Sequence, residues 1–224
     1  MTDKSLHGRI RAAILSLDLA PEQRLSERGL EPDFGASRTP IRAALMRLES
    51  EGLVQRDGKN WMVAPLDPQE IRVLYEYREI LEAAAVRLAI ARASRDDLEE
   101  LRELANSADT DETPEHSLDA GTSFHLELAR ISGNPFLEDT MRSVLTRLYR
   151  TRWLDVQSAE SRGRVHNEHS AIANALLAAD PAAAELATLE HLRGTEMRLE
   201  QSISADRLRL RANGISLRST AAAQ

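Results

Sequence analysis

The pattern of apolar and polar residues divides the chain into a mixed N-terminal part and a longer part that is helical throughout. In the first part, apolar residues lie at helical spacing from His7 to Leu17 and again from about Arg38 to Glu51. Two short runs of strand-forming residues, 53–56 and 61–64, then flank a tight turn at 57–60. This order predicts two helices followed by a β-hairpin.

A shorter helix is expected between these two, after the turn formed by Leu25-Ser26-Glu27. Ser26 is available as its N-cap, and Pro32 should shorten or distort it because proline donates no backbone hydrogen bond. Gly35-Ala36-Ser37 predicts a sharp turn before the next helix, and Gly52 is placed to end that helix. Three helices and a hairpin within residues 1–66 predict a winged helix-turn-helix.

Beyond a linker at Pro65-Leu66-Asp67-Pro68, we find helical patterns only and no strand. The breaks fall at Thr113-Pro114, Ser132-Gly133-Asn134-Pro135 and Asp180-Pro181, where proline starts a new helix. Six helices with short connections indicate an antiparallel α-helical bundle. The expected helices are 69–92, 95–108, 115–131, 135–157, 162–179 and 181–203.

We therefore expect a mainly α protein with two domains. Residues 1–66 form the winged helix-turn-helix, and residues 69–203 form an all-helical domain. The tail at 204–224 has poor periodicity, and we expect it to be mobile.

Composition narrows the class of protein. The 224 residues contain no cysteine, which excludes disulfides and thiolate metal sites. No apolar run approaches the roughly 20 residues that span a bilayer, and no signal-peptide stretch opens the chain. A cytoplasmic protein without a membrane partner is expected.

The net charge of −7 argues at first against a nucleic-acid partner. The charge is unevenly spread, however. Residues 1–66 carry ten lysines and arginines against nine acidic residues, a balance of +1, whereas the remainder carries 19 against 27, a balance of −8. A near-neutral first domain followed by an acidic remainder of the chain is compatible with a local DNA-binding surface.

The helix from 38 to 51 has the layout of a DNA-reading helix. Its apolar face, with Ile41 and Leu45, should pack into the core, while Arg38 and Arg42 lie one turn apart near its N-terminal end. An arginine fork can bridge O6 and N7 of a guanine, and Thr39 can hold a phosphate. A solvated helix with surface arginines is the alternative.

The run from Ser37 to Val54, SRTPIRAALMRLESEGLV, resembles the recognition helix of GntR-family transcription regulators, as do the upstream Leu25-Ser26-Glu27 and Phe34-Gly35. Glu31-Pro32 and Ala43 depart from the family pattern, and the wing is a little short. The resemblance implies contacts to double-stranded operator DNA. It assigns Arg28, Arg38 and Arg42 to bases or nearby phosphates, and Ser37, Thr39 and the wing tip at Gly58 to the backbone or the minor groove.

The second part resembles the FadR-like branch of the same family, with its all-helical FCD-type effector domain. The resemblance lies in the segments 77–82, 124–135, 168–172 and 191–192. Many members of this branch bind a divalent metal with one aspartate and three histidines, and the metal helps to hold a small carboxylate. The histidine positions correspond to His125, His169 and His191, and imidazole suits Zn²⁺ or Ni²⁺.

The aspartate of that pattern is missing, because Gly121 occupies its position one turn before His125. Asp119 lies about 120° round the helix and about 9 Å along it from His125, too far to reach on a regular helix. A three-histidine site completed by water or effector oxygens is one interpretation. Histidines hydrogen-bonded within an apolar core are the other.

Arg78 is the candidate effector-binding residue. It lies among Leu74, Leu81 and Ala85 on a predicted helix, where a charge is costly unless paired. Glu82, four residues on, offers a plain ion pair. A clamp on an effector carboxylate by two parallel hydrogen bonds is the functional alternative.

These observations predict a homodimeric transcription regulator controlled by a small-molecule effector. They decide neither the operator sequence nor between a repressor and an activator. A helical metallohydrolase is the rival, but the adjacent His-Asp pair common in such enzymes is absent, and His166-Asn167 is the nearest approach, so no enzyme is expected. A third hypothesis makes the helical domain a metal-free dimerisation module or a sensor of a larger effector, such as an acyl thioester.

Overall fold

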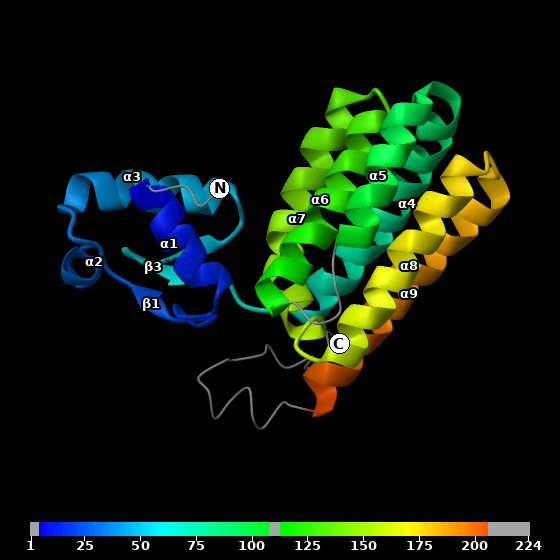
Figure 1. Cartoon of the computed structure of the whole chain (residues 1–224). Coiled ribbons are helices and arrows are strands. Elements are labelled where there is room, and N and C mark those ends of the chain that lie inside the picture. The colour runs from blue at the N-terminus through cyan, green and yellow to red at the C-terminus, as the bar shows by residue number, and fades with distance from the viewer. Residues whose placement is uncertain (1–4, 108–112, 206–224) are drawn as a thin grey trace, which may run out of the picture. The chain divides into compact units, whose positions relative to one another are not determined.

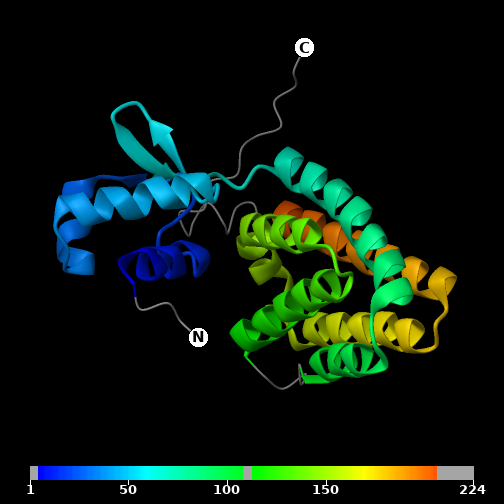
Figure 2. The same cartoon turned by 90° about the horizontal axis from the view of Figure 1, so that it is seen from above.

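The computed structural model describes residues 5–107 and 113–205, with residues 202–205 described by backbone only. The chain divides into two compact units; the second spans Ile71–Ser202, and the first contains the residues up to Glu70 together with those from Ile203 on. The N-terminal unit combines helices with a small sheet, and the second unit is a helical bundle (Figures 1 and 2). Most of the predicted tail, residues 206–224, lies outside the described residues.

The N-terminal unit is the winged helix-turn-helix that the sequence predicts. Its β-strands pair antiparallel in the order β1-β3-β2. Ile10, Ile41, Leu45 and Trp61 are almost fully buried in its core, so the apolar face of the candidate DNA-reading helix packs inward as expected. The elements are α1 (Leu6–Leu15), β1 (Arg24–Leu25), α2 (Glu27–Phe34), α3 (Arg38–Ser50), β2 (Val54–Asp57) and β3 (Asn60–Val63).

The predicted caps fix the turn between α2 and α3. The Ser26 side chain accepts a hydrogen bond from the backbone N–H of Gly29, which starts α2. Gly35, with φ +60°, ends α2 in the left-handed region, where glycine has no steric cost. Pro32 lies inside α2, which is only eight residues long.

Three local predictions need correction. Leu25 does not lie in a turn but pairs with Trp61 in the sheet, an interaction between distant segments that a local pattern cannot reveal. The hairpin turn is narrower than 57–60, because Asp57 and Asn60 already pair as strand residues. The first helix ends at Leu15, and Leu17, with φ +66°, does not continue it.

The second unit consists of six long helices in the described residues, and it confirms the predicted antiparallel bundle. The helix α6 packs on α5 and α7, and α5 also packs on α8. The start of α8 precedes the predicted one by three residues because the Ser158 side chain caps it. The helices are α4 (Pro68–Arg92), α5 (Arg95–Ser107), α6 (Pro114–Ile131), α7 (Pro135–Asp155), α8 (Ala159–Leu177) and α9 (Pro181–Ala205).

The part of the bundle core that includes α5 is mostly aliphatic. One buried cluster draws on five helices, and its members include Val86, Leu101, Phe124, Ile172 and Ala184. The cluster ends at Phe124, whose ring stacks on His169 at 4.4 Å between centroids, so polar groups adjoin the apolar core there. None of the described helices is both long enough and apolar enough to cross a membrane.

Candidate functional site

The three predicted histidines meet inside the bundle. His125 comes from α6, His169 from α8 and His191 from α9, and all three are buried. The Nε2 atom of His191 lies 3.3 Å from Nε2 of His169 and 3.4 Å from Nε2 of His125. One ligand atom from each residue lies within 4.8 Å of the others. Helices far apart in sequence thus bring three nitrogen donors to one point.

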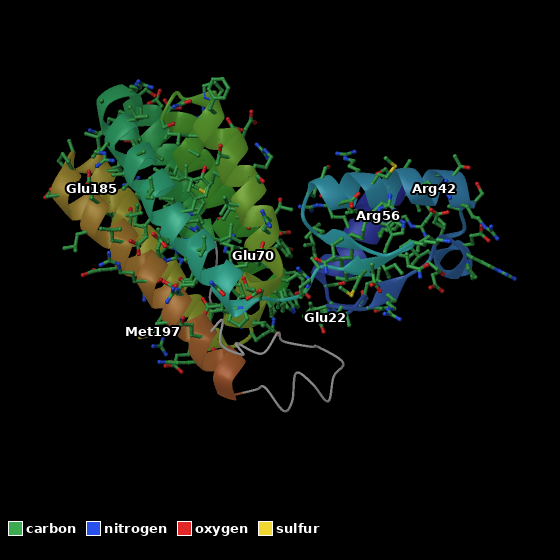
Figure 3. All side chains as sticks on the ribbon, turned by 180° about the vertical axis from the view of Figure 1, so that it is seen from behind. Glu22, Arg42, Arg56, Glu70, Glu185 and Met197 are labelled. Atoms are coloured by element: carbon green, nitrogen blue, oxygen red, sulfur yellow. The ribbon has the colours of Figure 1, made fainter. Side chains whose placement is uncertain are left out.

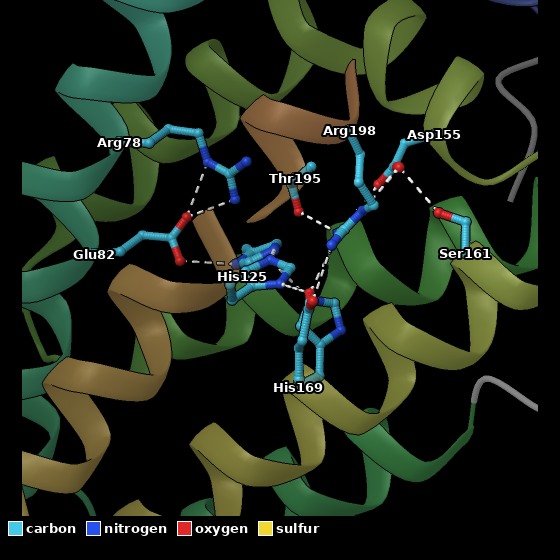
Figure 4. A network of polar contacts seen from close by, with 10 residues as sticks. Arg78, Glu82, His125, Asp155, Ser161, His169, Thr195 and Arg198 are labelled. Atoms are coloured by element: carbon cyan, nitrogen blue, oxygen red, sulfur yellow. Dashed lines mark hydrogen bonds and ion pairs between the residues drawn. The ribbon is translucent and has the colours of Figure 1, made fainter. Parts of the chain in front are cut away.

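Two carboxylates hold the far sides of two of these rings (Figure 4). Oε2 of Glu82, on α4, lies 2.9 Å from Nδ1 of His125, and Oε2 of Glu168, on α8, lies 2.7 Å from Nδ1 of His191. A carboxylate only accepts, so each Nδ1 carries the proton and donates it. The Nε2 atoms of His125 and His191 lie 3.4 Å apart, and in a neutral ring each of them carries a lone pair.

Burial opposes a proton on two of the three rings. Burial lowers the pKa of His125 to about 3, although Glu82 opposes the shift. Burial also lowers the pKa of His169 well below its usual value, and the neighbouring His191 adds to the effect. The pKa of Glu82 is raised by burial but lowered more by Arg78 and His125, so this carboxyl stays ionised. At neutral pH, His125 and His169 are thus neutral imidazoles.

The donor set fits a divalent metal ion. Tetrahedral zinc with Zn–N bonds of about 2.0–2.1 Å places its nitrogens about 3.4 Å apart, as two of the three nitrogen pairs are here. Metal-bound histidines commonly donate their other N–H to a carboxylate, as His125 and His191 do. Three protein ligands leave a further position for a ligand from outside the chain.

No carboxylate joins the three nitrogens among the described residues. The helix α6 runs unbroken through Gly121, which is buried, and Asp119 stays exposed on another face. The hydroxyl of Tyr149 donates to Asp119 at 3.1 Å. The regular helix therefore keeps Asp119 away from the histidines, in the way its spacing predicts.

Arg78 is fully buried and makes the ion pair considered from the sequence. Its Nε and Nη2 atoms donate to Oε1 of Glu82 at 2.9 and 2.6 Å. Its Nη1 atom is buried without a partner, and so is the hydroxyl of Tyr75 one turn earlier. The ion pair thus uses two of the three guanidinium nitrogens, and Nη1 makes no hydrogen bond.

Sequence reasoning missed several residues of this site. Glu82 was considered only as a partner of Arg78, and Glu168 and Arg152 were not singled out. Glu168 contacts His191, 23 positions away, and Arg198 donates to Glu168 and to Asp155. No periodicity connects such pairs, because they depend on how α8 and α9 pack together.

The candidate DNA-contacting residues are exposed on the N-terminal unit. Arg42 points outward from α3 (Figure 3), and its Nε and Nη2 atoms bond the carboxylate of Glu27 at 2.6 and 2.8 Å. Arg38 lies 3.5 Å from a carboxylate oxygen of Glu31. The exposed set also contains Arg28, Ser37, Thr39 and Gly58 at the hairpin turn.

Comparison with known proteins gives two family matches. Residues 73–194 match the FCD domain, and residues 2–61 match the family described as bacterial regulatory proteins, gntR family. The Nta operon transcriptional regulator of Aminobacter aminovorans is 35% identical over 167 residues, 72% of this chain and 77% of that protein. The HTH-type transcriptional regulator LutR of Bacillus subtilis is 30% identical over 203 residues, 80% of this chain and 92% of that protein.

A solved structure of similar fold is the E. coli protein McbR/YncC. It has a TM-score of 0.70 with 22% identity, and the match covers 88% of this chain and 95% of that chain. The two family matches together span both structural units and agree with the fold of each. Relatives of this kind are transcription regulators rather than enzymes. The chain therefore belongs to the GntR family of bacterial transcription regulators, and its helical part is an FCD domain.

Proposed function

We propose that this regulator is controlled by a small carboxylate that binds at a divalent metal ion held by His125, His169 and His191. The observation that carries the proposal is the 3.4 Å separation of the Nε2 atoms of His125 and His191, two rings whose Nδ1 atoms both lie against carboxylates. Two lone pairs repel each other, and a cation between them removes the repulsion. The metal would act as a Lewis acid that holds a carboxylate oxygen of the effector.

The N-terminal unit would bind double-stranded operator DNA through α3 and the hairpin. Arg38 and Arg42 would read base edges in the major groove, and Arg28, Ser37, Thr39 and Gly58 would contact the backbone or the minor groove. One such helix reads few base pairs, so a dimer on a roughly palindromic operator is needed for useful specificity. Effector binding would then change the spacing of the two DNA-binding units.

An exposed apolar stripe supports a homodimer. Val73, Tyr77 and Ile80 lie at positions i, i+4 and i+7 of α4, on one face, and are 53%, 43% and 63% exposed. The neighbouring helix α9, joined to α4 by the ion pair of Arg193 with Glu79, adds the exposed Met197 (Figure 3). Apolar side chains grouped in this way commonly mark a protein interface.

Elemental analysis of protein purified without added metal tests the metal site. We expect about one zinc or nickel ion per chain, lost in His125→Ala and retained in the control His116→Ala, which alters an exposed histidine of the same helix. Absence of metal from the unaltered protein and failure to take up added Zn²⁺ would reject the metal site. The helical domain would then be a metal-free sensor or dimerisation module.

A further inference from the structure

Arg152 is a buried cation without an anionic partner. Its side chain lies in the bundle interior with 7% of the residue exposed. Nη1 donates to the Thr122 hydroxyl at 2.9 Å, and no carboxylate of the described residues lies within ion-pair distance. Burial, together with the charge of nearby Arg78, lowers the pKa of Arg152 to about 10. The group still carries its charge at neutral pH, and an unpaired buried charge is costly.

The guanidinium lies beside the histidine cluster because position 121 is glycine. A Cβ atom at Gly121 would be 3.1 Å from Nη2 of Arg152 and 3.2 Å from Cε1 of His169. Cε1 is bonded to the Nε2 that points at the other histidines. Arg152 therefore presents a positive charge at the place where a side chain from α6 would otherwise stand next to the three nitrogens.

Two further polar atoms near Arg152 lack partners. Nη1 of Arg78 and the hydroxyl of Tyr75 are buried and make no hydrogen bond. Burial raises the pKa of Tyr75, while the charges of Arg78 and Arg152 oppose this, and the guanidinium carbon of Arg78 lies 5.4 Å from the centre of the Tyr75 ring. Buried donors are normally satisfied in native proteins. Nη1 of Arg78 and the Tyr75 hydroxyl thus lack acceptor oxygens, whereas Arg152 lacks a counter-charge.

The buried charges around the histidines balance in number without an ion. Arg78 and Arg198 contact three carboxylates, and Arg152 is a third guanidinium that contacts none of them. The carboxylates are Glu82, Glu168 and Asp155. A divalent metal bound by neutral imidazoles therefore adds two uncompensated positive charges to a buried site. A ligand with two negative charges restores the balance, and a monoanion leaves one charge unmatched.

From this charge count and the unpartnered donors, we infer that the effector is a small dicarboxylate, selected by Arg152. One carboxylate completes the coordination of the metal next to His169, where the chain supplies no carboxylate of its own, and Arg152 binds it. The second carboxylate accepts hydrogen bonds from Nη1 of Arg78 and the hydroxyl of Tyr75. The inference rests on the proposed metal site and adds the charge class of the effector.

Isothermal titration of the zinc-loaded full chain with acetate, malonate and succinate tests the inference. We expect a dicarboxylate to bind at least about tenfold more tightly than acetate, because each unmatched buried charge is expensive. Arg152→Gln should remove most of this preference and leave the zinc content unchanged. Arg142→Gln, which alters an exposed arginine of the same helix, should leave both unchanged.

Gly121→Asp provides a second variant in which the chain supplies the missing negative charge. A Cβ at this position would require Nη2 of Arg152, the end of a flexible side chain, and Cε1 of His169 to shift by a few tenths of an ångström. We expect this variant to hold zinc more tightly and to lose the preference for a dicarboxylate.

Equal binding of acetate and dicarboxylates to the zinc-loaded protein, or an unchanged preference in Arg152→Gln, would overturn the inference while leaving the metal site intact. Absence of zinc would overturn both, and elemental analysis separates the two cases.

Discussion

Arg42 of α3 and Glu27 of α2 form a two-bond ion pair across the helix-turn-helix. Nε of Arg42 lies 2.6 Å from Oε1 of Glu27, and Nη2 lies 2.8 Å from Oε2. The arginine side chain is 63% exposed, whereas the glutamate side chain is 18% exposed. A parallel pair of bonds fixes the plane of the guanidinium. Glu27 thus orients the proposed base-reading group and also cancels its charge, and the two effects can be separated by mutation.

Arg42→Ala should weaken binding to the specific operator by about 1–3 kcal/mol, since it removes a bidentate contact to a base. Binding to non-operator DNA should fall much less. Fluorescence anisotropy with operator and scrambled duplexes measures both affinities. Arg47→Ala is the control, because Arg47 lies in the last turn of the same helix and pairs with Glu51. Equal losses on both duplexes would assign Arg42 to a phosphate instead.

Glu27→Gln should have a different effect. It removes a negative charge beside Arg42 and loosens the guanidinium, so affinity for non-operator DNA should rise while the ratio of specific to non-specific binding falls. The dependence of the binding constant on salt should also become steeper, by about one phosphate contact. A variant with unchanged salt dependence and unchanged specificity would show that the ion pair does not matter for DNA binding.

The positions of the helices and of the three histidines could be predicted from the sequence because the signals are local or come from the family resemblance. Thr113 and Asn134 accept capping hydrogen bonds where the sequence predicts helix starts. The short strand β1 could not be predicted, since Leu25 pairs with Trp61, 36 positions later. A two-residue strand has no periodicity of its own.

The residues that surround the histidines could not be predicted from local sequence patterns either. Glu168 lies next to His169 in sequence but bonds His191 on another helix. Arg152 acquires its place only when α7 packs on α6, where Gly121 leaves room for its guanidinium. Contacts of this kind depend on helix rotation and separation, which a pattern of apolar residues fixes only coarsely.

Glu82→Gln should lower metal affinity about 10–100-fold, the usual cost of altering the hydrogen-bond partner of a metal-bound histidine. The amide still fits the space, but it no longer fixes the Nδ1 proton of His125 and leaves Arg78 without its buried counter-charge. Competition with a zinc chelator measures the affinity. Glu79→Gln, on an outer face of the same helix, should have no effect on it. An unchanged affinity in Glu82→Gln would remove Glu82 from the site.

Asp97 should contribute to acid stability. Hydrogen bonds from Ser94 and Arg130 lower the pKa of Asp97 to about 2, from an ordinary value of 3.8. Since the folded-state pKa is the lower one, the stabilisation is fully present above pH 3.8 and is lost as the pH falls towards 2. Asp97→Asn should therefore lower the melting temperature at pH 7 and flatten its decrease in that acid range. Asp96→Asn, in the same turn, is the control. Identical melting curves for the two variants would contradict the assignment.

Ile80→Lys should convert the dimer into a monomer. Ile80 is 63% exposed at the end of the stripe of Val73 and Tyr77, so its replacement costs the folded monomer little. In a dimer that covers this face, however, a lysine would bury an unpaired charge. Light scattering coupled to size exclusion gives the mass of each form. Phe136→Lys, at a position 80% exposed on α7, should leave the mass unchanged. A dimeric Ile80→Lys protein would place the interface on another face, and loss of operator affinity in a monomeric one would show that both half-sites are needed.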